Sequence, residues 1–320
     1  MVYSFAVPST LVLTSCTSRK RRGAVPITLD GSDPKEDLTA IASRWKSQLE
    51  GAPPSHQVSH LYVGRAFANA YDAARRVDGE LYVVSAGLGL VHESDNVPCY
   101  DLTFADPANR LACVLAAQGR AASDWWSALR EVGIGRGSVA DLIKSARPSL
   151  TLIALPSGYM DMLARDLGSL SDDTLECVRI FTSTAGAASL TSRLSRLVMP
   201  YDGCLESVTG YSGTQTDFAQ RALLHYVSEL DGGYLTLEDG RHAVSEALAG
   251  LAPRQNPSRT RLDDSQIAAM LRRNWKAHGG SSSRLLRFLR REAQVACEQS
   301  RFRDIWRAVK VELAAKEPAR

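Results

Sequence analysis

The chain has 320 residues, of which 44% are hydrophobic and 23% are charged, and these values are typical of a globular protein with a large core. No apolar run approaches the ~18 residues of a membrane-spanning helix, and no basic segment precedes the mildly apolar first residues as it would in a signal peptide. The six cysteines include no Cys-x-x-Cys pair, which argues against a zinc site and a secreted disulfide framework, so we expect a cytoplasmic protein without a metal or other cofactor.

Charge is distributed unevenly along the chain. Residues 253–320 carry 16 basic and 7 acidic side chains, a net charge of +9, whereas the rest carries 22 and 28, a net charge of −6. An acidic body with a basic end is typical of a polyanion-binding module joined to another domain. A solvated helical tail is the alternative interpretation.

Residues 10–16 form an apolar run that predicts a buried first strand. The run ends in Thr17, Ser18 and four basic residues, which suit an anionic or polar ligand because hydroxyls and backbone N–H groups donate and Lys20 supplies a charge. The spacing of a Walker loop is missing, and an exposed basic turn is the alternative. Amphipathic helices are predicted over 34–50 and 61–77, and the start of the second, Tyr62 to Arg65, could face the same site.

The stretch 81–104 carries the strongest signal for a site. Its apolar start predicts a buried strand, Leu81 to Ser85, and Gly87 and Gly89 then open a polar loop. An apolar strand that ends in such a loop builds a site at the carboxyl end of a sheet. The candidate site residues of this stretch are Ser85, Gly87, His92, Glu93, Tyr100, Asp101 and Thr103.

Strands alternate with helices in the following part of the chain. A helix is predicted over 108–132, and strands are predicted at 150–155 and 178–182. Tyr159 lies in the small-residue loop after the first of these strands. This alternation indicates an α/β fold with a mostly parallel sheet flanked by helices, whose loops cluster at one edge.

The polar stretch 197–217 is long and irregular, and such loops are usually functional. Asp202 and Glu206 are its candidate site residues, and Asp217 is a plausible N-cap of a helix over 217–230.

Turn-forming residues then mark a boundary between two domains. We predict an α/β catalytic domain at 1–235, a linker at 236–260 and a basic helical DNA-binding domain at 261–320. Three short helices in the last domain fit a small helix-turn-helix-like fold, and a helical cap packed on the body is the alternative. The candidate DNA-contacting residues are Arg19, Arg284, Arg287, Gln299, Arg301 and Arg303.

Three segments together resemble a known family. They are Ser15-Cys16-Thr17-x-x-Lys20, Val84-Ser85-Ala86-x-x-Gly89-Leu90-Val91 and Pro98-Cys99-Tyr100-Asp101-Leu102-Thr103. The combination resembles the bacterial domain family grouped with the peroxide-stress protein YaaA, and its Cys-x-x-Lys start is similar to the deazapurine-modifying domain of archaeosine synthase. The resemblance covers residues 8–105 and, through Tyr-Asp-Gly-x-Leu-Glu, residues 201–206.

The resemblance implies DNA binding and nucleobase chemistry. Some defence proteins that look like this are DNA glycosylases for hypermodified phage bases, and the segment Ala-Cys-Glu-Gln-Ser-Arg-Phe at 296–302 is similar to the tail of such proteins. The chain departs from uracil glycosylases, because it has no Gly-Gln-Asp-Pro-Tyr segment.

Cleavage of a base–sugar bond develops positive charge on the sugar and negative charge on the departing base. We expect Asp101 to be the carboxylate beside the sugar, with Glu93 and Glu206 as competitors, and Lys20 or Arg19 to stabilise the departing base. For Asp101 and Lys20, a turn cap and a surface lysine are the alternatives. The side chains that could bind the base or the sugar are Ser15, Cys16, Thr17, Ser85, His92, Tyr100, Thr103, Tyr159 and Asp202.

The sequence therefore predicts a DNA glycosylase that excises a modified base from double-stranded phage DNA after the base has left the stack. A DNA-binding regulatory module without catalysis is one alternative. A group-transfer enzyme that uses Lys20 or Cys16 as its nucleophile is another. The glycosylase hypothesis requires the turns around residues 16 and 101 to converge on one cavity.

Overall fold

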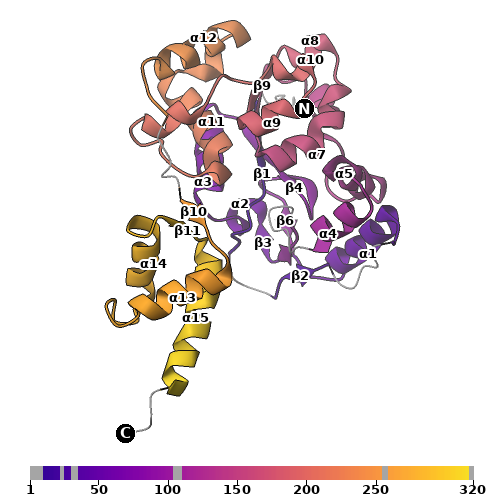
Figure 1. Cartoon of the computed structure of the whole chain (residues 1–320). Coiled ribbons are helices and arrows are strands. Elements are labelled where there is room, and N and C mark those ends of the chain that lie inside the picture. The colour runs from indigo at the N-terminus through magenta and orange to yellow at the C-terminus, as the bar shows by residue number, and fades with distance from the viewer. Residues whose placement is uncertain (1–9, 22–24, 30–34, 104–109, 254–258, 317–320) are drawn as a thin grey trace. The chain divides into compact units, whose positions relative to one another are not determined.

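The computed structural model describes residues 10–21, 25–29, 35–103, 110–253 and 259–316. The chain forms two compact units, Met1–Arg254 and Gln255–Arg320 (Figure 1). The larger unit is built on one mostly parallel sheet with helices, which confirms the predicted α/β class.

The central sheet of the larger unit has five strands in the order β5-β4-β1-β8-β9. β1, β4, β8 and β9 run parallel, and β5 pairs antiparallel with β4. The parallel strands are buried almost throughout because helices cover both faces of the sheet, so they appear in the sequence as continuous apolar runs. The strands are β1 (Thr10–Ser15), β4 (Glu80–Ser85), β5 (Gly89–His92), β8 (Leu150–Ala154) and β9 (Val178–Phe181).

The direction in which strands are added to the sheet reverses at β1. The chain leaves β1 and returns as β4 on one side, then adds β8 on the other side of β1 and β9 beyond it. Connections that diverge from two neighbouring strands leave a crevice outside the carboxyl ends of those strands, where open α/β sheets bind ligands. The strand order therefore places such a crevice at the ends of β1 and β8.

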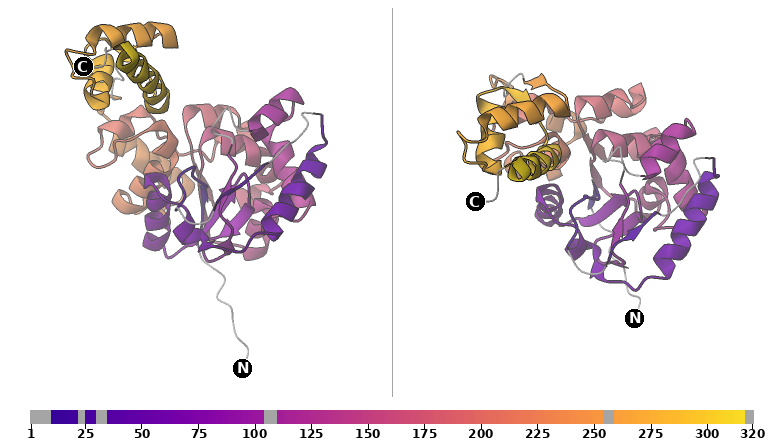
Figure 2. Two further views of the ribbon diagram at one scale, coloured as in Figure 1. Left: turned by 90° about the horizontal axis from the view of Figure 1, so that it is seen from below. Right: turned by 60° about the horizontal axis from the view of Figure 1, so that its bottom comes forward.

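Two groups of helices cover the sheet. α3 and α11 pack side by side and contact β1 and β8, while α1, α5 and α7 pack in series; Figure 2 shows the sheet between the two groups. The α-helices of the larger unit are α1 (Leu38–Glu50), α2 (Val58–Leu61), α3 (Arg65–Arg76), α4 (Arg110–Ala117), α5 (Ala122–Glu131), α6 (Val139–Ala146), α7 (Ser157–Gly168), α8 (Asp172–Leu175), α9 (Thr184–Ala188), α10 (Ser192–Ser195), α11 (Phe218–Glu229) and α12 (Leu237–Leu248).

Short elements complete the larger unit. The strand β2 (Ile27–Thr28) pairs with β7 (Tyr100–Asp101), and β3 (His56–Gln57) pairs with β6 (Asn96–Val97). The 3-10 helices are η1 (Gly203–Ser207), η2 (Gln215–Asp217) and η3 (Gly232–Tyr234).

The polar loop predicted after Ser85 is instead a tight hairpin. Ser85 pairs with Gly89, and β5 then runs back along β4 until His92 lies opposite Tyr82. Glu93 follows at the start of β4, where its backbone N–H donates to the Leu81 carbonyl at 3.0 Å. The prediction that this segment carries polar residues to the carboxyl edge of the sheet is therefore wrong for residues 92 and 93.

Buried polar groups hold the hairpin turn in place. The Ser85 hydroxyl accepts hydrogen bonds from the backbone N–H groups of Gly87 and Leu88, at 3.1 and 3.0 Å. The indoles of Trp45 and Trp125 donate to the carbonyls of residues 87 and 86, at 2.6 and 2.7 Å. The carbonyls of the turn are thus satisfied by side chains from α1 and α5, which allows the turn to be buried.

Other segments of the larger unit hydrogen-bond to both outer strands of the sheet. At β5, the backbone N–H of Arg136 donates to the Leu90 carbonyl at 2.7 Å. At β9, the Ile180 N–H donates to the Leu197 carbonyl, and the Met199 N–H donates to the Ile180 carbonyl, at 2.9 and 2.8 Å.

The smaller unit has an apolar core of its own. It contains α13 (Asp264–Asn274), α14 (Ser282–Arg291), α15 (Gln299–Lys316) and the paired strands β10 (Thr260–Arg261) and β11 (Val295–Ala296). Residues 275–281 connect α13 to α14, a longer connection than the turn of about 3–4 residues in a helix-turn-helix. The core is formed by Ile267, Leu271, Leu285, Leu289, Val295, Cys297, Phe302, Ile305 and Val309.

The linker predicted at 236–260 begins too early. Residues 237–248 form α12, and the hydroxyl of its N-cap, Thr236, accepts from the Asp239 N–H. Val244 and Leu248 are buried in the large core. Turn-forming neighbours obscure this helix in the sequence.

No helix within the described ranges is long and apolar enough to cross a lipid bilayer.

Replacing Gly89 by alanine should destabilise the larger unit by about 1–3 kcal/mol. The backbone φ at Gly89 is +66°, and a Cβ there would lie 2.7 Å from the Ile134 carbonyl oxygen. The matched control is Gly168→Ala, because nothing lies within 4 Å of that Cβ position. Urea denaturation followed by circular dichroism should show a lower midpoint for G89A alone, and equal midpoints for both variants would contradict the strain assigned to the hairpin.

Candidate functional site

A cavity of about 750 Å³ lies at the carboxyl ends of β1 and β8, in the crevice that the strand order predicts. Its volume is within the range of roughly 300–1,000 Å³ that small-molecule sites occupy. Its wall consists of residues 15–19, 63–66 and 156–159 together with Thr103, Thr214, Thr216 and Asp217.

The turn after β1 forms one side of the cavity. The backbone N–H of Cys16 donates to the Val84 carbonyl at 3.0 Å, and the Thr17 hydroxyl donates to the Arg19 carbonyl at 2.8 Å. The Cys16 thiol lies 2.9 Å from the Tyr159 hydroxyl at the start of α7. Burial raises the pKa of Tyr159 well above its usual value, and the neighbouring Cys16 acts in the same direction, so the phenol stays protonated and can donate.

Two helices begin at the cavity. The N-cap of α3 is Gly64, at φ +117°, and the N-cap of α7 is Pro156, and neither supplies a side-chain hydrogen bond to its helix. The first N–H groups of a helix have no acceptor within the helix, and the helix dipole is positive at that end. Because residues 64–66 and 156–158 line the cavity, both helix starts make its wall electropositive.

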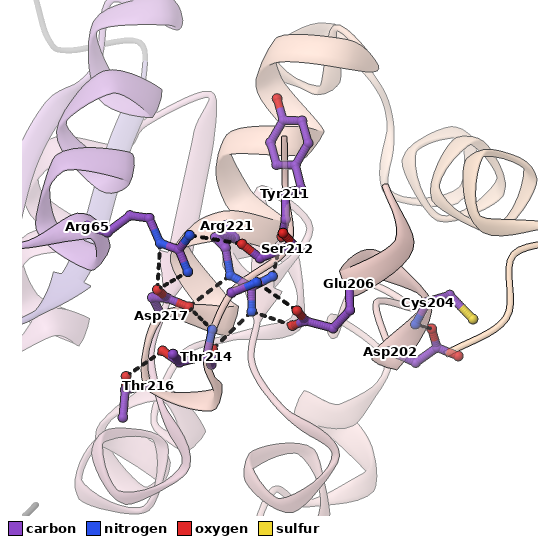
Figure 3. A network of polar contacts seen from close by, with 11 residues as sticks. Arg65, Asp202, Cys204, Glu206, Tyr211, Ser212, Thr214, Thr216, Asp217 and Arg221 are labelled. Atoms are coloured by element: carbon purple, nitrogen blue, oxygen red, sulfur yellow. Dashed lines mark hydrogen bonds and ion pairs between the residues drawn. The ribbon is translucent and has the colours of Figure 1, made fainter. Parts of the chain in front are cut away.

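Two arginines and two carboxylates form a network that we call the arginine–carboxylate cluster (Figure 3). Two of its members, Arg65 and Asp217, line the cavity. Asp217 accepts from Arg65 Nε and from Arg221 Nε, each at 2.8 Å. Arg221 also donates to Glu206 at 2.6 Å, and Arg65 donates to the Ser212 carbonyl at 2.9 Å. The cluster thus ties the start of α3 to the loop before α11 and fixes the position of the Arg65 guanidinium in the cavity wall.

The cluster is buried on one side and open on the other. Arg221 is 1% exposed, whereas 47% of the Arg65 side chain is exposed, so one cation is structural and the other can reach a ligand. Burial of Asp217 would raise its pKa, but hydrogen bonds from the Thr214 N–H, Arg65 and Arg221 outweigh this effect and lower the pKa. Among the described residues, Asp217 is the one carboxylate in the cavity wall, and it is held ionised.

Tyr100 connects the turn after β1 with the segment that follows the hairpin. Its hydroxyl lies 2.6 Å from the Ser85 hydroxyl and 2.7 Å from the Tyr62 hydroxyl, and the Lys20 ammonium lies 4.3 Å from the centre of its ring. Burial raises the pKa values of Tyr62 and Tyr100. Gly87 permits this packing, because a Cβ there would lie 2.5 Å from the Tyr100 ring.

Many predicted site residues lie at or directly behind the cavity. The turn around residue 16 meets Thr103 there, because Cys16 and Thr103 share the cavity wall. The predicted residues in the wall are Ser15, Cys16, Thr17, Arg19, Thr103 and Tyr159. Another group of predicted residues contacts Tyr100 directly or through Ser85 and lies behind the cavity wall. This group consists of Lys20, Ser85, Gly87 and Tyr100 itself.

Asp101, the first candidate for the catalytic carboxylate, is exposed and does not line the cavity. It pairs with Thr28 in the β2–β7 ribbon. Side chains alternate along a strand, so burial of Tyr100 turns the next side chain outward. The geometry therefore does not place Asp101 beside a ligand in this cavity.

Glu93 and His92 lie at the opposite end of β4, because the hairpin carries them back. Glu93 forms an ion pair with Arg75 at the end of α3. The His92 ring packs 4.9 Å from the Tyr82 ring, and its Nδ1 lies 2.7 Å from the Ser94 hydroxyl. Neither residue lines the cavity.

Asp202 and Glu206 have structural partners instead. Asp202 caps η1 by accepting from the Cys204 N–H at 2.8 Å. Glu206 accepts from Arg221 and from the Gly213 N–H, at 2.6 and 2.7 Å. Glu206 contributes to the site by supporting the cluster, and it does not line the cavity.

Ser157, Thr216 and Asp217 are wall residues that the sequence does not single out as site residues. The sequence contains a signal for Asp217 alone. Asp217 and Arg221 are four residues apart at the start of a helix, a spacing that favours an ion pair. The partner that gives Asp217 its place at the site is Arg65, 152 residues away in the sequence, and no local pattern predicts this contact.

The predicted DNA-contacting residues of the smaller unit have different environments. Arg284 and Arg287 are exposed on α14, and Gln299 is exposed at the start of α15. Arg301 is bound to Asp264 at 2.6 Å and to the Leu262 carbonyl, so its role is at least partly structural. Arg303 is exposed beside Asp304, at 3.7 Å.

A second hollow, of about 720 Å³, lies beside the β3–β6 ribbon. Arg21, His56 and His60 line it, and it shares no lining residue with the cavity at the ends of β1 and β8. Within the described ranges, no group of three His, Cys, Asp or Glu is placed to hold a metal ion.

Replacing Asp217 by asparagine should destabilise the larger unit by about 3 kcal/mol at pH 7, because it leaves the buried Arg221 with one carboxylate. The pKa of Asp217 is lowered on folding, so its contribution is present above about pH 4 and is lost as the pH falls through the folded value. Urea midpoints of the wild type and D217N should therefore differ most at neutral pH, and the difference should shrink as the pH falls below about 4. Asp172→Asn removes a carboxylate whose side chain is 69% exposed and should have little effect; a difference for D217N that does not depend on pH would contradict the assignment.

Comparisons of this chain with protein-family models, with curated proteins and with solved structures gave no match. The family likeness of the three sequence segments therefore stays a resemblance, and the cavity itself is the basis for a functional conclusion.

Proposed function

We propose that the cavity binds one nucleotide of a DNA strand and that the protein cleaves the bond between a modified base and its sugar, leaving an abasic site. One observation supports this proposal most directly. Two helix starts without side-chain caps, together with Arg19 and Arg65, line the cavity at the carboxyl ends of β1 and β8. Backbone N–H groups at helix starts, arginines and hydroxyls together form an anion-binding wall, and phosphate is the anion that a nucleotide presents.

The phosphate would lie between the starts of α3 and α7. The N–H groups of residues 65, 66, 157 and 158 are the donors without helical acceptors on that side. Arg65 is held in place by Asp217 and the Ser212 carbonyl, so it loses little side-chain freedom when an anion binds.

The sugar would lie next to the phosphate, beside Asp217, and the base would extend along the turn after β1. Ser15, Cys16, Thr103 and Tyr159 contribute hydroxyl and thiol groups there, beside the aromatic ring of residue 159. Hydroxyls can bind the edge of a base or the oxygens of a sugar, and an aromatic ring can stack on the base. Tyr159 is kept protonated and can donate a hydrogen bond to the departing base.

Asp217 replaces Asp101 as our candidate for the carboxylate of the reaction. Because its pKa is lowered, it is suited to stabilise positive charge on the sugar and not to accept a proton. In the reaction, a water oxygen bonds to C1′ and the bond from C1′ to the base nitrogen breaks. The base leaves with the electron pair and takes up one proton, so that the balance is water plus nucleotide to free base plus abasic sugar.

One observation favours a second function, group transfer through Cys16. The thiol lies at the cavity wall with the Tyr159 hydroxyl 2.9 Å away, so a substrate in the cavity would meet a sulfur nucleophile. Lys20, the other nucleophile considered, points to the Tyr100 ring and does not line the cavity.

Replacing Arg65 by glutamine should weaken the binding of 2′-deoxynucleoside 5′-monophosphates by about 10- to 100-fold, the effect of losing one hydrogen bond to a charged group. The matched control is Arg75→Gln in the last turn of the same helix, where the arginine pairs with Glu93 away from the cavity. Isothermal titration calorimetry measures both affinities. Equal affinities for R65Q and R75Q would remove the phosphate site from the start of α3.

The reaction is tested by incubating the full chain with a panel of DNAs that carry different modified bases, followed by mass spectrometry of released bases and alkaline cleavage of abasic sites. Excision should continue in C16S and fall by about 100-fold or more in D217N, whose fold is checked by circular dichroism. Loss of activity in C16S, together with a covalent adduct on the wild-type thiol, would favour group transfer. If the protein bound every DNA of the panel and left it intact, both base excision and group transfer would be rejected, and a regulatory role would remain.

A further inference from the structure

We propose that α14 carries the surface by which this chain holds double-stranded DNA, through a stripe of three arginines on its outer side: Arg284, Arg287 and Arg291. We call this set the arginine stripe. The choice of DNA among polyanions rests on the proposed function, whereas the existence of a polyanion surface rests on the smaller unit alone.

The two sides of α14 have different roles. Leu285 and Leu289 are buried in the core of the smaller unit, and the three arginines are exposed. Residues at positions i, i+3 and i+7 lie on one face of a helix, so the arginines form a row about 10 Å long along the helix axis. The apolar side is already used by the core, so α14 has no free apolar face with which to insert into a membrane.

Other arginines of the smaller unit are bound within it. Arg272 pairs with Glu312 at 2.7 Å, Arg301 pairs with Asp264 at 2.6 Å, and Arg290 donates to the Cys297 carbonyl at 3.0 Å.

By contrast, no carboxylate among the residues that the structure describes lies within ion-pair distance of any member of the arginine stripe. Three exposed guanidinium groups without internal counter-ions repel each other, and a partner with closely spaced negative charge relieves this repulsion.

The connection before α14 is held by two tryptophans. Gly279 and Gly280 have φ values of +59° and +63°, and a Cβ on Gly280 would lie 2.9 Å from Trp275 Nε1. The Trp306 indole stacks on Trp275, with ring centres 6.1 Å apart, and donates to the Gly280 carbonyl at 3.0 Å. These contacts fix the orientation of α14 relative to α13 and α15. The arginine stripe therefore lies on an ordered surface of the smaller unit.

Duplex DNA is the partner whose charge matches this surface. One strand presents a phosphate for each ~3.4 Å of duplex axis, so a row about 10 Å long corresponds to about three phosphates. Guanidinium groups bind phosphate oxygens in pairs, and such contacts hold a protein on DNA without reading its sequence.

The test is the salt dependence of binding. Fluorescence anisotropy of an unmodified duplex of random sequence gives the slope of log K against log salt concentration for the full chain. Each phosphate contact contributes ~0.9 to the magnitude of this slope. The slope of the variant R284Q/R287Q/R291Q should therefore be smaller in magnitude than that of the wild type by about 2.7. The control R303Q/R307Q/K310Q removes the same charge from α15 and should change the slope by less than about 1.

Further arms separate charge from folding and DNA from other polyanions. The variant R284K/R287K/R291K keeps the charges and should keep most of the slope, and circular dichroism checks the fold of each variant. Equal losses in the α14 and α15 variants would overturn the proposal, because net charge alone would then explain binding. Preference for duplex RNA or for phosphatidylserine vesicles over DNA, lost with the same three arginines, would overturn it too. Retained binding without base excision would reject the cavity reaction and leave the arginine stripe intact.

Discussion

The burial of Arg221 is the constraint on which the candidate site depends. A guanidinium group that is 1% exposed has lost its water, and the resulting cost of several kcal/mol is offset only where carboxylates and carbonyls surround it. Glu206 and Asp217 provide the charges, and the Thr214 carbonyl accepts a further hydrogen bond at 2.9 Å. The loop before α11 is therefore held in one arrangement by the need to satisfy a single buried cation.

This arrangement places fixed positive groups in the wall of the cavity. Asp217 is occupied on one side by Arg221 and binds Arg65 with its other oxygen, so the exposed cation stands in a fixed position beside the start of α3. The start of α7 adds a second positive end from across the crevice. Groups that are oriented before a ligand arrives need no reorganisation when it binds, which is the condition under which dipoles and charges act most strongly on a reaction.

The sequence predicts the parallel strands and the place of the cavity, because buried strands are apolar runs and their exits are polar. It does not predict which polar residues remain at that edge. The hairpin after Ser85 depends on the backbone of Gly89 lying against residue 134 and on two indoles that bind its turn, and neither contact is local. Asp101 looks suitable because it adjoins Tyr100, yet strand alternation turns it outward, while Asp217 looks like an ordinary helix cap until Arg65 is placed beside it.

The hydrogen bonds that residues 136, 197 and 199 make to the outer strands have a consequence for assembly. An open sheet with free outer strands is a template onto which an extended peptide or a second copy of a chain can add by backbone pairing. Here part of that pairing capacity is already used internally at β5 and at β9. Strand addition, and the aggregation that it can cause, is thereby opposed at these positions of both outer strands.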